Sequence, residues 1–174
     1  MSIIYPGRFQ PPHYGHIKKI YLIEETFEEE PKLLILVSKR KDFYNPLSEE
    51  EVLDLIKSYK INFDYDFLYS PFEILKKVKK YDLLITGSYK KHLIYKLLNK
   101  NSIYIPREKI KKKEVSSTYI KKLVIDNKIE EALNYVNHKT LYKLLEKKES
   151  SILLENFSDK EKFIKKLFYK YNFI

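Results

Sequence analysis

The residues best suited to chemistry are grouped in one decapeptide, GRFQPPHYGH, which runs from Gly7 to His16. The chain has only three glycines and four histidines, and this segment holds two of each. Glycine lets a ligand approach the backbone closely, and an imidazole can donate a hydrogen bond to a phosphate oxygen. The spacing of His13, Gly15 and His16 therefore predicts a phosphate-binding turn. Metal binding by the two histidines is an alternative, although the sequence suggests no third ligand.

The residues around this turn predict that it joins a buried strand to a helix. Residues 2–5 form a short apolar run that ends before Gly7, and apolar residues at helical spacing follow from residue 14. A helix N-terminus presents unpaired N–H groups and the positive end of the helix dipole, and both favour an anion. We therefore expect His16, on the first helical turn, and His13, in the preceding loop, to converge on one phosphate.

The rest of the sequence alternates strand-like and helix-like segments and then becomes helical. Apolar runs of strand length, separated by segments with helical periodicity, are typical of a parallel sheet covered on both faces. The predicted strands lie at residues 2–5, 32–38, 65–70, 82–86 and 102–106. This order predicts an α/β fold, a Rossmann-like, doubly wound parallel five-stranded sheet with a helical C-terminal part. In the strand order 3-2-1-4-5, Gly7 and Gly87 end neighbouring strands at the crevice where such sheets bind ligands.

Length and hydrophobic content fit one domain with a small appended piece. The chain has 174 residues, of which 44% are hydrophobic, and this is enough to bury a core. We expect the sheet and the C-terminal helices to form one domain over residues 1–147. Residues 148–174 carry Phe163, Leu167 and Phe168 on one helical side, which predicts a helical tail that packs on the domain or on a neighbouring subunit.

Composition limits the class of protein. The chain has no cysteine, which excludes disulfide frameworks and thiolate metal sites. Its apolar N-terminal run is too short for a signal peptide, and no apolar run approaches the ~20 residues of a membrane-spanning helix. We therefore expect a cytoplasmic protein with no membrane partner. The net charge of +10 is compatible with a lysine-rich surface or with an anionic partner, and charge alone does not choose between them.

Four segments together resemble the nucleotidylyltransferase superfamily. The decapeptide resembles its signature, in which a glycine-containing turn leads to His-x-Gly-His, and GRFQP is most similar to archaeal-type nicotinamide mononucleotide (NMN) adenylyltransferases. Three further segments resemble this family in the same order, namely NPLSEEE (45–51), LLITGS (83–88) and VSSTYIKKLV (115–124). The resemblance implies a nucleotidylyltransferase domain over residues 1–147. It also implies an enzyme that transfers AMP from ATP to the 5′-phosphate of NMN, giving NAD and pyrophosphate.

The resemblance implies the site residues as well. The implied catalytic residues are His13, His16, Arg8 and Lys121. The implied ATP-binding residues are Gly7, Arg8, Phe9, His13, Gly15, His16, Gly87, Ser88, Ser116, Thr118 and Lys121. Within this set, Ser116, Thr118 and Lys121 would contact the β- and γ-phosphates, and Gly87 and Ser88 would lie near adenine and ribose. Mg²⁺ would be held by phosphate oxygens without a protein ligand, and the relatives suggest a homo-oligomer.

The chain departs from the family pattern in ways that concern the acceptor. Relatives often have arginine at the position of Lys121 and at that of Val52, and some stack the nicotinamide ring on a tryptophan, which this chain lacks. Phe72 or Tyr69 would then serve as the acceptor-binding aromatic residue. Other acceptors, such as phosphopantetheine or FMN, and a CTP-dependent reaction are alternatives. A non-catalytic nucleic-acid-binding module is a lower-ranked one, because scattered lysines do not explain where the glycines and histidines lie; we therefore expect no nucleic-acid partner.

Overall fold

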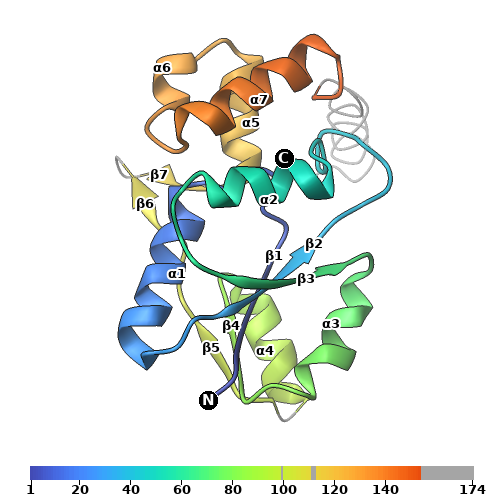
Figure 1. Cartoon of the computed structure of the whole chain (residues 1–174), viewed down its shortest axis with the longest axis vertical. Helices are drawn as coiled ribbons and strands as arrows, with labels where there is room; N and C mark the ends of the chain where they lie inside the picture. Colours follow the sequence, from blue (N-terminus) through green and yellow to red (C-terminus); the bar gives the residue numbers. More distant parts are fainter. Residues whose placement is uncertain (99, 111–112, 154–174) are drawn as a thin grey trace, which may run out of the picture.

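The computed structural model describes residues 1–98, 100–110 and 113–153 (Figure 1). Its centre is a parallel sheet of five strands in the order β3-β2-β1-β4-β5. The strands are β1 (Ile3–Gly7), β2 (Lys32–Leu36), β3 (Asp64–Leu68), β4 (Leu83–Thr86) and β5 (Ser102–Tyr104). The predicted α/β class, the doubly wound sheet and its strand order are confirmed.

Helices cover both faces of the sheet, which explains the almost continuous apolar strands. The helices between the strands are α1 (Tyr14–Phe27), α2 (Glu49–Lys57), α3 (Pro71–Val78) and α4 (Tyr89–Leu97). Side chains along a strand alternate between the faces. Leu33 and Ile35 of β2 therefore join the core made with α1 and α2, whereas Leu34 joins the core made with α3 and α4.

Helix α2 begins at a capping box formed by Ser48 and Glu51. The Ser48 Oγ accepts a hydrogen bond from the Glu51 backbone N–H at 3.1 Å, and the Glu51 Oε2 accepts one from the Ser48 N–H at 2.8 Å. The same carboxylate lies 2.6 Å from the Lys147 Nζ. The start of α2 is therefore held both by its own cap and by the C-terminal helices.

The C-terminal helices form a third apolar core beyond the carboxyl ends of the strands (Figure 1). They are α5 (Ser117–Ile125), α6 (Ile129–Ala132) and α7 (His138–Glu149). This core is built from Ile120, Val124, Tyr135 and Leu144, all nearly inaccessible to water. The helical C-terminal part is thus confirmed, and its first helix begins at the edge of the sheet where a ligand is expected.

Residues 107–115 are rich in lysine and predict a basic loop between β5 and α5, and the structure differs from this prediction. It contains an antiparallel hairpin of β6 (Lys109–Ile110) and β7 (Lys113–Glu114). Ile110 packs against the C-terminal core, and the Val115 N–H donates to the Glu108 carbonyl oxygen at 2.9 Å. One apolar residue within the basic run is therefore enough to attach the segment to the core and allow strand pairing.

Within the described residues, no helix has both the length and the apolar character needed to cross a membrane. The domain boundary at residue 147 stays a prediction. Residues 154–174, most of the expected helical tail, lie outside the described residues.

Asn137 links the C-terminal helices to the end of α2. Its Oδ1 accepts from the Thr140 N–H at 2.8 Å and so caps α7, while its Nδ2 donates to the Ser58 Oγ, just after α2, at 2.7 Å. We expect Asn137→Ala to lower the free energy of unfolding by about 1–2 kcal/mol, because both bonds are lost. Urea unfolding followed by circular dichroism measures the change. The exposed Asn101→Ala should unfold like the native protein, and an unchanged midpoint for Asn137→Ala would contradict the linking role.

Candidate active site

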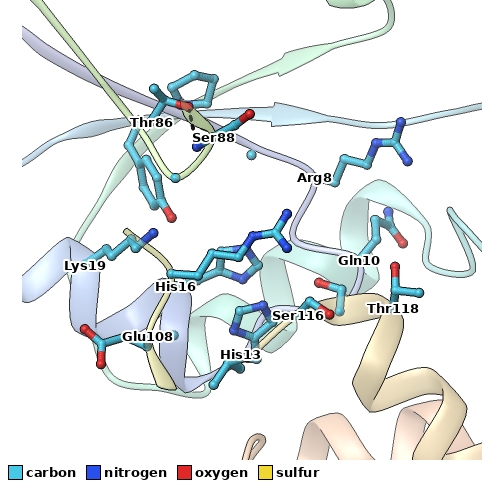
Figure 2. A pocket seen from close by; sticks show the side chains of 18 of the residues that line it. Arg8, Gln10, His13, His16, Lys19, Thr86, Ser88, Glu108, Ser116 and Thr118 are labelled. Carbon is cyan, nitrogen blue, oxygen red and sulfur yellow. Dashed lines mark hydrogen bonds between the residues drawn. The ribbon is translucent and has the colours of Figure 1, made fainter. Parts of the chain in front are cut away.

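A cavity of about 230 Å³ lies at the carboxyl ends of β1 and β4, where the strand order reverses (Figure 2). Its wall is formed by the loop after β1, the first turns of α1 and α4, the segment after β5 and the start of α5. Segments far apart in the sequence thus meet at the crevice that doubly wound sheets use for ligands.

Two stacked histidine rings lie at the centre of this cavity (Figure 2). The centroids of the His13 and His16 rings are 3.7 Å apart, and the ring planes differ by 20°. His13 is only 5% exposed. The Nδ1 atom of each ring is buried and has no hydrogen-bond partner among the described residues. Buried polar atoms without partners are rare in folded proteins, so we expect a water molecule or a ligand to complete this site.

Both imidazoles are neutral at pH 7 in the absence of a ligand. Burial lowers the pKa of His13 to about 3, and the nearby cations Lys19 and Arg107 act in the same direction. Burial, followed by the neighbouring His13 ring, lowers the pKa of His16 well below its ordinary value. Each ring therefore carries one N–H donor, and an anion is needed before either can hold a positive charge.

The sequence around the histidines leaves room for the stack and supports it. A methyl group at Gly15 would stand 3.1 Å from the His13 Nδ1 and 3.3 Å from the Val115 Cβ, so a larger residue would crowd the ring. On the other side the Phe9 ring packs against His16, with 4.7 Å between the ring centroids. Phe9 is itself buried in the sheet core, so the core determines where the His16 ring lies.

The loop that carries His13 is fixed from two directions. The Gln10 side chain forms two hydrogen bonds with the backbone of Leu47, donating at 3.1 Å and accepting at 2.9 Å. The Ser117 hydroxyl donates to the Pro11 carbonyl oxygen at 2.9 Å. The loop is therefore held by the segment before α2 and by α5, and its geometry exists before a ligand arrives.

Two helix N-termini open onto the cavity. Residues of the first turns of α1 and α5 line it, and neither turn contains an acidic residue. Helix α5 is capped by the Ser116 Oγ, which accepts from the Tyr119 N–H at 3.2 Å. The N-cap of α1 is His13, whose side chain makes no capping hydrogen bond. Two positive helix ends therefore face one space, an arrangement that favours phosphate.

Two buried lysines add positive charge from within the protein. Lys19 is 4% exposed and Lys121 is 2% exposed, and both line the cavity. The Lys121 Nζ lies 4.6 Å from the centroid of the Phe43 ring. Burial lowers the pKa of Lys121 to about 7, with a further decrease from Arg8 that Asp42 partly opposes. A polyanion would compensate these charges, since isolated buried ammonium groups are unfavourable.

The cavity lining is suited to anions rather than to a protein-bound metal ion. Arg8, Lys91 and Arg107 also line it, and Glu108 is the acidic side chain among its described lining residues. No cluster of three or more histidine or acidic residues that could hold a metal ion occurs in the described part of the chain. A divalent cation here would depend on phosphate oxygens for its ligands.

The comparison with protein families agrees with this arrangement. The model of the family described as cytidylyltransferase-like matches residues 4–123. The chain belongs to the cytidylyltransferase-like family. The matched range extends from β1 into α5 and so includes all parts of the cavity wall. The resemblance to nucleotidylyltransferases predicted from the sequence is confirmed.

Individual relatives of this cytidylyltransferase-like chain share parts of it. A nicotinamide-nucleotide adenylyltransferase from Sulfurisphaera tokodaii is 37% identical over 70 residues, which cover 38% of this chain and 39% of the relative. A solved bifunctional NMN adenylyltransferase/ADP ribose pyrophosphatase from Francisella tularensis, complexed with AMP and a manganese ion, matches 99% of this chain and 57% of its own, with a TM-score of 0.65 and 17% identity. A macrolide-efflux protein from Streptococcus pneumoniae matches 76% of this chain and 55% of its own, with a TM-score of 0.54 and 15% identity. The matches thus span about half or less of each relative.

Most residues predicted for the site of this family member meet at the cavity. Those that line it are Gly7, Arg8, His13, Gly15, His16, Gly87, Ser88, Ser116, Thr118 and Lys121. Phe9 instead lies behind His16 in the core. Phe72 and Tyr69 are 75% and 54% exposed and do not line the cavity. Val52, at the family's arginine position, is buried between α2 and the sheet.

Several lining residues of this site were not predicted from the sequence. Lys19 and Lys91 come from helices, and Tyr44 supplies an aromatic side chain from the loop after β2. Arg107, for which the sequence left either a phosphate or a carboxylate partner open, lines the cavity, and its Nη1 lies 3.7 Å from the Glu114 Oε2. A signal existed for Lys19, since it follows His16 by three residues and therefore lies on the same face of α1.

Proposed function

We propose that this chain is an adenylyltransferase that transfers AMP from ATP to the 5′-phosphate of NMN, giving NAD and pyrophosphate. The observation that carries the proposal is the stacked, neutral pair His13 and His16, with unpartnered Nδ1 atoms, between two helix N-termini free of acidic residues. The choice of NMN rests on the similarity to the Sulfurisphaera tokodaii adenylyltransferase over 70 residues.

The proposed reaction needs no protein nucleophile. An oxygen of the acceptor phosphate forms a bond to the α-phosphorus of ATP, and the bond from that phosphorus to the bridging oxygen of the β-phosphate breaks. Pyrophosphate leaves with the electron pair. Because the attacking oxygen is already negatively charged, a strong general base is unnecessary. Alignment and stabilisation of negative charge would account for the rate.

Each part of the cavity has a role in this proposal. His13 and His16 would donate hydrogen bonds to the reacting α-phosphate, where charge changes most in the transition state. Lys121 and Arg8, with the first turn of α5, would neutralise the departing pyrophosphate. Ser88 would contact the adenosine moiety. We expect Mg²⁺ to arrive bound to ATP phosphates, because phosphate oxygens are ligands that this hard ion prefers.

The direct test is incubation of the purified protein with ATP, Mg²⁺ and NMN, followed by chromatographic detection of NAD. We expect NAD and pyrophosphate in equal amounts. Omission of either substrate should abolish both products. Pyrophosphate without NAD, or no consumption of ATP, would contradict the proposed reaction.

A second candidate is transfer of another nucleotide or transfer to another acceptor. The family's description as cytidylyltransferase-like favours including CTP in the comparison. Pyrophosphate release should therefore be measured with ATP and with CTP, each against NMN, phosphopantetheine and FMN. The proposal requires that ATP with NMN has the highest kcat/KM of these pairs.

A further inference from the structure

Lys19 is a buried cation that the proposed reaction has not yet used. It extends from α1 toward the end of β4, where a methyl group at Gly87 would stand 2.7 Å from its Nζ. The Nζ donates one hydrogen bond, to the Ile105 carbonyl oxygen at 2.9 Å. A glycine at the end of β4 is therefore what allows the ammonium group to lie at the cavity wall.

The charge of Lys19 is only partly compensated by the protein around it. Among the described residues it forms no salt bridge, although Glu108, which lies 3.9 Å from the Lys18 Nζ, is close enough to raise the pKa of Lys19. Burial is the largest influence and lowers the pKa of Lys19 to about 8, and Arg107 adds to the decrease. An ammonium with two unused donors in such surroundings is stabilised best by an anionic oxygen.

The place of Lys19 relative to the histidines indicates which anion this is. Figure 2 shows Lys19 on one side of the stacked rings and Ser116 and Thr118, at the start of α5, on the other. In an in-line displacement the attacking and leaving groups lie on opposite sides of the phosphorus. If pyrophosphate leaves toward α5, the acceptor enters from the side of Lys19.

We propose that Lys19 binds an anionic group of the acceptor, on the side of the stacked histidines opposite to α5. The inference rests on the proposed function for the identity of the acceptor. The anionic oxygen belongs either to the 5′-phosphate, present in every mononucleotide, or to a ring carboxylate, present in nicotinate mononucleotide but not in NMN. Both are recognised by the same chemistry, and the experiment separates them.

The test is calorimetric titration of single ligands, which requires no turnover. Lys19→Met removes the charge at similar length, and Lys18→Met, at an exposed neighbouring lysine of the same helix, is the matched control. We expect Lys19→Met to weaken binding of the acceptor at least about tenfold. If the partner of Lys19 is the phosphate, the affinities for NMN and for nicotinate mononucleotide should fall alike. Weakening of nicotinate mononucleotide alone would identify the carboxylate. ATP should bind Lys19→Met within about threefold of native, and Lys18→Met should bind all three ligands normally.

Two results overturn the inference. Unchanged binding of both acceptors to Lys19→Met is one, and weakening confined to ATP is the other. If the native protein binds neither acceptor, the proposed function is overturned as well. If the native protein binds an acceptor and Lys19→Met binds it equally well, only the inference about Lys19 is overturned.

Thermal unfolding separates ligand binding from a structural role. Without ligand, Lys19→Met should unfold at the native temperature or above it, because a buried and only partly compensated charge is removed. A lower unfolding temperature together with native acceptor binding would show that the lysine only supports Ile105. If Lys19→Met fails to fold, Lys19→Gln keeps an N–H donor for the Ile105 carbonyl and tests the charge by the same titrations.

Discussion

The His16→Ala variant should show a kcat at least about 100-fold below that of the native protein, with nearly native ATP binding. The His16 ring is held by Phe9 on one face and stacked on His13, and it carries a buried nitrogen without a partner among the described residues. A donor placed in this way costs no reorganisation during the reaction. Its hydrogen bond should therefore strengthen mainly in the transition state, which lowers kcat rather than affinity when it is lost.

Steady-state kinetics and an equilibrium titration with ATP measure the two effects separately. His138→Ala, at an exposed position at the start of α7, is the control and should retain native kinetics. A His16→Ala variant with native kcat would refute the role, and so would a loss that appears only in the affinity for ATP.

Removing the charge of Lys121 should lower kcat/KM by about 100- to 1000-fold, since this cation would face the departing pyrophosphate. Lys121→Met tests the effect, and Lys122→Met, at an exposed neighbouring position, is the control. The side chain of Lys121 lies in the cavity wall against Phe43. Methionine should fill the same space, so a folded protein with low turnover is expected.

The pH dependence of Lys121 gives this prediction a second readout. Burial lowers its pKa to about 7 in the free protein, and only the protonated form carries the charge that a triphosphate needs. The contribution of the Lys121 charge to kcat/KM is therefore fully present below pH 7. As the pH rises through 7, kcat/KM should fall by up to about tenfold per pH unit. Arginine remains charged throughout this range, so Lys121→Arg should lack the fall.

A kcat/KM that still falls near pH 7 in Lys121→Arg would assign the pH dependence to another group. Native activity in Lys121→Met would remove Lys121 from the mechanism. Because both outcomes are read from the same pH profiles, the position of the charge and its protonation are tested together.

The strands and the main helices were predictable because their patterns are local. Apolar runs such as residues 32–38 need cover on both faces, and the Ser48 capping box marks where α2 begins. The pairing of β6 with β7 was missed because the C-terminal core, against which Ile110 packs, comes from residues later in the chain. A contact with residues far along the chain produces no periodic pattern of apolar residues in the segment that makes it.

The sheet, its crevice and the turn with His13 and His16 could be predicted from residues that are neighbours in the chain. That Lys19 reaches the cavity beside Gly87 became visible in the folded structure alone. The same holds for Tyr44, which lines the cavity, and for the exposed Phe72 and Tyr69, which do not line it. Burial and charge compensation depend on groups that packing brings together from distant parts of the chain. Lys19 therefore resembles a surface residue in the sequence and is a buried, only partly compensated cation in the fold.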